Sequence, residues 1–263
     1  MTLKKILKGI IPYGIIWIYK NHKEEIVEII TGGGYYDHIL SLYPNCEPAF
    51  QFQRYFGFVE SSLFTWCASQ RFAGFIESIK NPNKIFSNGI IPHLDWNNML
   101  ECKETGLNFH GNLANKELLD ENGKYDDKKI EIEYANVISR VKHLVEKLKI
   151  IWNSNDTQLY ILACNEFEHR FECSDIDQIY RILKEKTKYV SLLVIIQRED
   201  LYRIARSHYI SNKNIIVKKI GKWTPVDKVT TVELSDEKGW KRIFRCIKTQ
   251  SLDQEGKKYK FNK

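Results

Sequence analysis

Apolar runs and helical apolar stripes alternate along the second half of the chain. Residues 158–164 and 189–196 are almost continuously apolar, which is typical of strands buried on both faces of a parallel sheet. Residues 132–151 and 175–186 instead place apolar side chains at helical spacing. This alternation predicts an α/β fold, with a mostly parallel sheet covered by helices on both faces in three layers.

The first half of the chain gives weaker signals. A strand is expected over residues 36–43 and a helix over 46–56, because Asn45 is a favourable N-cap and Pro48 is tolerated in a first helical turn. Residues 81–101 read as irregular, with two prolines and Asn-rich turns. The remaining expected elements are helices over 68–79 and 236–246 and strands over 106–109, 215–220 and 229–234.

Residues 1–34 form a separate basic region. Residues 3–20 predict an amphipathic helix in which lysines flank an apolar run, but the run at 10–19 contains Pro12 and Gly14 and is too short to span a membrane. This helix either contacts a membrane surface or packs on the rest of the protein. We expect one α/β domain over 35–248 and a basic, flexible tail over 249–263.

Charge and cysteine content narrow the functional classes. The formal net charge is +7, with lysine and arginine concentrated near both ends, and no nucleic-acid-binding motif accompanies them. Nucleic acid is therefore not an expected partner. The six cysteines are scattered without a CxxC pair, so they predict neither a zinc site nor a disulfide scaffold, and they indicate a reducing compartment such as the cytoplasm. No cofactor is indicated.

Candidate chemistry follows from the ends of the expected strands. In an open parallel sheet, ligands bind beyond the carboxyl ends of the strands. The polar residues just past four of the expected strands are Asn45 and Cys46, then His110, then Asn165 and Glu166, then Arg198. We expect these side chains to gather at one edge of the sheet.

Cys46 is the strongest candidate nucleophile in this set. A thiol at the start of a helix has its thiolate stabilised by the helix dipole and by unpaired backbone N–H groups, so its pKa is expected to fall. His110 is the best-placed base, and Asn165 or Glu166 would orient its imidazole. The structural alternative is that Cys46 is simply a small buried side chain.

The candidates for substrate binding are Asn45, Arg54, Trp66, His93 and Arg198. His93 lies in an irregular stretch that could line a site and is the rival of His110. Arg54, eight residues after Cys46, and Arg198 would hold a phosphate or carboxylate, although Arg54 also fits an ordinary surface position on a helix.

Residues 38–67, HILSLYPNCEPAFQFQRYFGFVESSLFTWC, resemble the opening block of a bacterial family described as papain-like cysteine peptidases. The matching features are the pair Asn45-Cys46, then Arg54, then a segment ending in Trp66. Residues 105–111, TGLNFHG, resemble the histidine segment of that family, and the likeness runs loosely from 36 to 244. Two positions depart from its pattern: Tyr43-Pro44 replaces Gly-Ser, and Thr65 replaces an aspartate.

The resemblance implies a thiol–imidazole pair and an association with capsule or lipopolysaccharide synthesis at the inner face of the membrane. We therefore expect Cys46 to act in acyl transfer or hydrolysis on a cell-surface polysaccharide component. Papain itself is an α+β protein with an antiparallel barrel, whereas the pattern here predicts a parallel sheet. Two alternatives stay open: a transferase that uses an activated sugar or coenzyme A without a covalent step, and a non-catalytic module of a glycan-assembly complex.

Overall fold

The structure is a computed structural model of the 263-residue chain. It describes residues 34–42, 46–57, 60–69, 71–87, 89–92, 99–166, 169–223, 236–245 and 247–249. The predicted N-terminal helix, the predicted strand at 229–234 and all but the first residue of the predicted tail lie outside the described residues.

A four-stranded parallel sheet forms the centre of the fold. Its order is β2-β7-β8-β9, and all three neighbouring pairs are parallel. The strands are β2 (His38–Ser41), β7 (Gln158–Cys164), β8 (Val190–Ile196) and β9 (Ile215–Lys219). Every residue of β7 is buried, as the continuous apolar run at 158–164 predicts.

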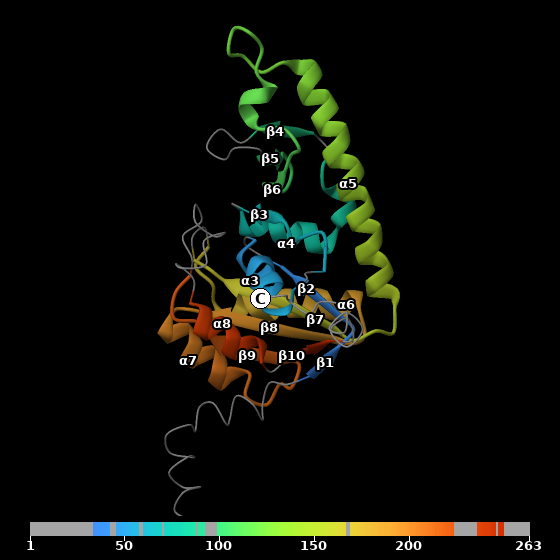
Figure 1. The fold of residues 1–263 in the computed structure, drawn as a ribbon. Helices are drawn as coiled ribbons and strands as arrows, with labels where there is room; N and C mark the ends of the chain where they lie inside the picture. The colour runs from blue at the N-terminus through green and yellow to red at the C-terminus, as the bar shows by residue number, and fades with distance from the viewer. Residues whose placement is uncertain are drawn as a thin grey trace, which may run out of the picture.

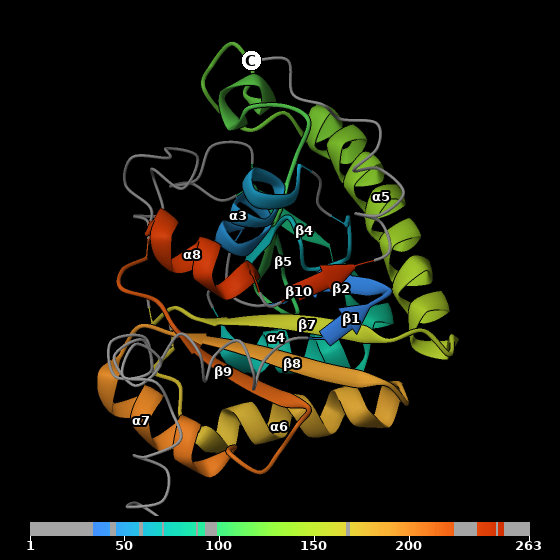
Figure 2. The same cartoon turned by 60° about the horizontal axis from the view of Figure 1, so that its bottom comes forward.

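Helices cover both faces of this sheet, so the predicted α/β class is confirmed. Figure 2 shows α6 and α7 on one side of the sheet and α3 and α8 on the other. Phe52 of α3 and Phe244 of α8 pack in one apolar cluster with Leu159 of β7. The helices are α3 (Glu47–Phe56), α6 (Cys173–Lys186), α7 (Glu199–His208) and α8 (Glu237–Phe244).

A second sheet is antiparallel, and it differs from what the sequence pattern predicts. Its order is β3-β6-β5-β4, with β3 (Cys67–Ser69), β4 (Ile90–Pro92), β5 (Met99–Cys102) and β6 (Leu107–His110). Residues 81–101 are therefore not merely irregular, and the helix expected over 68–79 is instead β3 followed by α4 (Phe72–Lys80). These strands have three or four residues, too few to show a period in the sequence.

Short elements complete the described part of the chain. The strand expected over 36–43 is divided into β1 (Gly34–Tyr36) and β2, and β1 pairs in parallel with β10 (Ile247–Thr249). Two 3₁₀ helices, η1 (Pro82–Lys84) and η2 (Asn115–Leu118), lie on either side of the β4-β5-β6 segment.

The long helix α5 (Asp127–Asn153) runs beside both sheets (Figure 1). Its apolar stripe, which includes Val137, Val141 and Leu148, is buried in the larger apolar cluster. That cluster also contains Leu162 of the parallel sheet and Leu100 of the antiparallel sheet, so one continuous core joins the two sheets. None of the helices among the described residues is both long and apolar enough to cross a membrane.

Candidate functional site at the seam of the two sheets

Cys46 lies between the parallel sheet and α3, as predicted. β2 ends at Ser41, α3 begins at Glu47, and Cys46 is the N-cap residue, although its side chain makes no capping hydrogen bond. Figure 1 shows α3 between the parallel sheet and β3. The predicted position of this thiol at a strand-to-helix junction is confirmed.

The surroundings of the thiol overturn one expectation. Cys46 is 8% exposed, and its Sγ lies 3.8 Å from the carbonyl oxygen of Cys67, the first residue of β3. Burial raises the pKa of the Cys46 thiol to about 12. The prediction that the end of the helix lowers this pKa is therefore wrong, because loss of hydration outweighs the helix dipole at this position. At neutral pH the group is a neutral thiol.

His110 belongs to the second sheet, and this corrects the prediction that it follows a strand of the parallel sheet. It is the last residue of β6, whose neighbours β3 and β5 are both antiparallel to it. Arg140 of α5 donates a hydrogen bond to the His110 carbonyl oxygen. Partial desolvation of the ring and the nearby charge of Arg140 lower the pKa of His110, so its imidazole is neutral at pH 7.

The edge strand β3 connects these two residues in space. Its first residue, Cys67, is the register partner of Phe109, the residue before His110. The thiol of Cys46 therefore meets β3, and His110 ends the strand that pairs with β3. Trp66 immediately precedes β3, and its ring packs edge-on against Phe50 of α3 at a centroid distance of 5.1 Å. The same helix thus supplies Cys46 and a contact for Trp66.

Asn165, Glu166 and Arg198 lie at the carboxyl edge of the parallel sheet, as predicted. Cys164 at the end of β7 pairs in register with Ile196 at the end of β8, so the residues that follow emerge side by side. Arg198 contacts Glu166 at 2.7 Å, and Asn165 is buried.

Arg198 already forms ion pairs and a hydrogen bond within the protein. Its Nε lies 2.8 Å from Asp200, and its Nη2 donates to the carbonyl oxygen of Phe171 at 2.9 Å. A substrate anion would therefore compete with two carboxylates for this guanidinium. The predicted substrate-binding role of Arg198 and the orienting roles of Asn165 and Glu166 stay predictions.

The remaining predicted residues are placed as follows. Arg54 lies in the last turn of α3 and is half-buried rather than fully exposed. Asn45 and His93 lie outside the described residues.

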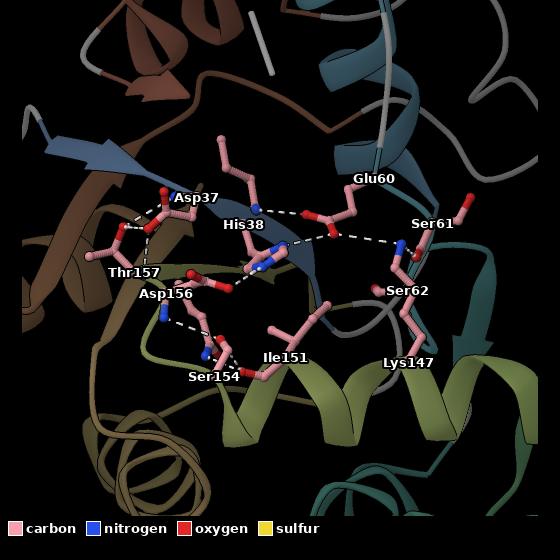
Figure 3. Close-up of polar contacts among 12 residues, drawn as sticks. Asp37, His38, Glu60, Ser61, Ser62, Lys147, Ile151, Ser154, Asp156 and Thr157 are labelled. Carbon is pink, nitrogen blue, oxygen red and sulfur yellow. Dashed lines mark hydrogen bonds and ion pairs between the residues drawn. The ribbon is translucent and has the colours of Figure 1, made fainter. Parts of the chain in front are cut away.

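Two histidine clusters escaped the sequence analysis. His169 contacts Asp175 through Nε2 at 3.0 Å and stacks on Phe72 with ring centroids 3.9 Å apart. His38, near the start of β2, lies between Glu60 and Asp156 (Figure 3). Only the contact of His169 with Asp175 joins residues that are close in the sequence, since Asp175 lies six residues later, in the first turn of a predicted helix. The partners of His38 are 22 and 118 residues away along the chain.

The described residues contain no cluster of three or more His, Cys, Asp or Glu side chains arranged to hold a metal ion. Their five cysteines are all free thiols. Comparison with protein-family models, curated proteins and solved structures finds no match to this chain.

Proposed function

We propose that this protein is a cysteine-dependent enzyme of acyl transfer or hydrolysis, with Cys46 as nucleophile and His110 as base. The observation that carries the proposal is the pairing of β3 with β6. Cys67, whose carbonyl oxygen contacts the Cys46 thiol, is opposite the residue next to His110. A thiol at a helix N-terminus and an imidazole on the adjoining strands are the two groups that acyl transfer through a thioester requires.

The charge states support general-base activation. The pKa of Cys46 is about 12 and the pKa of His110 is lowered, so both groups are neutral at pH 7. The thiol proton then moves to the imidazole as the sulfur–carbon bond forms, whereas a preformed thiolate–imidazolium pair would need the opposite shifts. Backbone N–H groups in the first turn of α3 stabilise the developing oxyanion, with the exception of Pro48, which has no N–H.

The second half-reaction decides between hydrolysis and transfer. Water attacking the thioester releases the acid, and a sugar hydroxyl attacking it forms an ester; either step regenerates the thiol. We propose a component of a cell-surface polysaccharide, of the capsule or lipopolysaccharide type, as the substrate. This rests on the sequence resemblance of residues 38–67 and 105–111. Trp66 of the first segment, next to β3, is half-buried.

Acylation by p-nitrophenyl acetate tests the nucleophile. The wild-type chain should give a burst of p-nitrophenol and an acetyl group on the peptide that contains Cys46, detected by mass spectrometry. Cys46→Ala should lose both, and His110→Gln should retain the thiol but acylate about 100-fold more slowly, since a general base contributes about that factor or more. Cys173→Ala is the matched control, because Cys173 is a more accessible thiol in the first turn of another helix.

Equal bursts from the wild type and Cys46→Ala would reject Cys46 as nucleophile. A normal burst from His110→Gln alone would reject His110 as base and leave the thiol in place. A transferase without a covalent step would show activity in Cys46→Ser together with loss in Arg54→Ala.

A further inference from the structure

A histidine at the amino end of the parallel sheet lies between two carboxylates. His38 Nδ1 lies 3.0 Å from Glu60 Oε1, and His38 Nε2 lies 3.2 Å from Asp156 Oδ2 (Figure 3). Glu60 belongs to the segment that joins α3 to β3, and Asp156 to the loop between α5 and β7. One imidazole therefore links three parts of the chain.

The ring can donate in both contacts only when it carries two protons. A neutral imidazole carries one N–H, so its other nitrogen would present a lone pair to a carboxylate oxygen. Only the imidazolium donates to Glu60 and Asp156 at once. The hydrogen bond to Glu60, assisted by the charges of both carboxylates, raises the pKa of His38 against the opposing effect of burial. Loss of the proton must weaken at least one of the two contacts.

Glu60 and Asp156 differ in their contacts beyond His38. Glu60 also accepts the backbone N–H of Ile39 at 3.2 Å, and Lys147 of α5 lies 3.6 Å from its Oε1. Asp156 has a side chain that is 50% exposed. The neighbouring Asp37 accepts hydrogen bonds from the backbone N–H and the hydroxyl of Thr157. Besides His38 itself, Lys147 is the cation among these groups.

The segment that Glu60 anchors leads directly to the Cys46 thiol. Thr65 donates to the Glu60 carbonyl oxygen at 3.0 Å and lies 2.7 Å from the hydroxyl of Ser62. Lys147 donates to the Ser61 carbonyl oxygen at 2.7 Å. These bonds make residues 60–65 a braced turn, and the next two residues are Trp66 and Cys67, which covers the thiol with its carbonyl group.

We propose that His38, Glu60 and Asp156 form a pH-sensitive latch that controls access to Cys46. In the protonated state the latch holds residues 60–67 against α3 and keeps the thiol covered. Deprotonation weakens the anchor, so the segment moves away from the thiol more often. Its importance as regulation rests on the proposed role of Cys46, but the opening itself does not require catalysis.

Alkylation of Cys46 by iodoacetamide tests the latch. The rate is followed by peptide mass spectrometry from about pH 5.5 to about pH 9, the range in which imidazoles titrate. Cys173 in the same sample reports the ordinary rise of thiol reactivity with pH. The ratio of Cys46 to Cys173 labelling should rise up to about fivefold through the titration of His38, since the loss of one partly exposed ion pair changes an equilibrium by up to about that factor.

Three variants separate the latch from other causes. His38→Gln should give the high ratio at every pH, because it has no imidazolium to lose. Asp156→Asn, at a half-exposed position that should fold normally, should move the step to lower pH because one carboxylate no longer favours the imidazolium. His208→Gln removes an exposed histidine that lies 3.6 Å from Asp177 and should leave the step unchanged.

A flat ratio in the wild type, or a step of the same size in His38→Gln, would overturn the latch. Failure of the proposed enzyme function gives a different result, in which the labelling step persists but Cys46→Ala retains the acylation burst.

Discussion

The parallel and antiparallel sheets differ in the length of their strands. β7 and β8 have seven residues each, and all seven residues of β7 are buried. β3 and β6 have three and four residues, and polar side chains are buried in both sheets, among them Gln158 of β7 and Asn108 of β6. The long strands supply the apolar centre, whereas the short ones depend on their neighbours. The Cys46 thiol follows a strand of the parallel sheet and is covered by the antiparallel one, so the proposed site lies where the two sheets meet.

Truncating the core of each sheet should give the largest effects and should separate the two regions. Leu162→Ala in β7 should lower the free energy of unfolding by about 4 kcal/mol, and Leu100→Ala in β5 by about 2 kcal/mol, within the range for buried leucines. The difference is expected because the shorter sheet can collapse around a cavity more easily. Urea denaturation followed by far-UV circular dichroism measures both values. Equal losses would mean that the two sheets are packed equally rigidly.

Gly74→Ala should disturb the antiparallel sheet selectively. A Cβ at Gly74 of α4 would overlap the backbone of Thr105, in the turn before β6. Because backbone cannot move aside easily, we expect a loss of about 2 to 3 kcal/mol and slower acylation of Cys46 as β6 shifts. Gly123→Ala is the control: its φ is +73° but a Cβ would meet no atom within 4 Å, so it tests conformational cost alone. Unchanged acylation in Gly74→Ala would argue against a role for β6.

The His38 latch should add pH-dependent stability at the boundary of the two regions. The pKa of His38 is raised in the folded protein, so its stabilisation is complete below the unfolded pKa of about 6.5 and is lost as pH rises through the folded value. The difference in thermal midpoint between wild type and His38→Gln should therefore be largest near pH 5.5 and should disappear near pH 9. A difference that grows with pH would contradict the protonated contacts.

An exposed ion pair on the antiparallel side should have the smallest effect. Lys84 lies 2.8 Å from Glu77, and both side chains are well exposed. Because exposed pairs of this kind contribute little, Lys84→Ala should leave the thermal midpoint unchanged at physiological salt. A clear drop would show that η1 and α4 depend on this contact.

The sequence predicted the parallel sheet far better than the antiparallel one. The strand expected over 158–164 has the same bounds as β7, because a strand buried on both faces appears in the sequence as one apolar run. Residues 81–101 contain β4 and part of β5, and these strands are set by the pairing of β4 with β5 and of β5 with β6 rather than by any local period. His110 was assigned to the wrong sheet for the same reason.

In the candidate site, too, some features follow from local sequence and others depend on distant segments. The position of Cys46 follows from local signals, namely a strand and a helix, although the N-cap is Cys46 itself and not the predicted Asn45. The burial of its thiol does not, because the covering carbonyl belongs to Cys67 and depends on how β3 packs. The partners of His38 also come from distant segments.

Helix α5 sets the spacing between the turn before β3 and the end of β6. Arg140 binds the end of β6 and Lys147 binds the turn before β3, and these two residues are seven positions apart on one helix. Seven residues make almost two full turns, so both side chains leave the same face about 10.5 Å apart along the axis. The helix therefore fixes the distance between these two segments. If the turn moves relative to β6, either the Arg140 or the Lys147 hydrogen bond must lengthen, or the helix must bend.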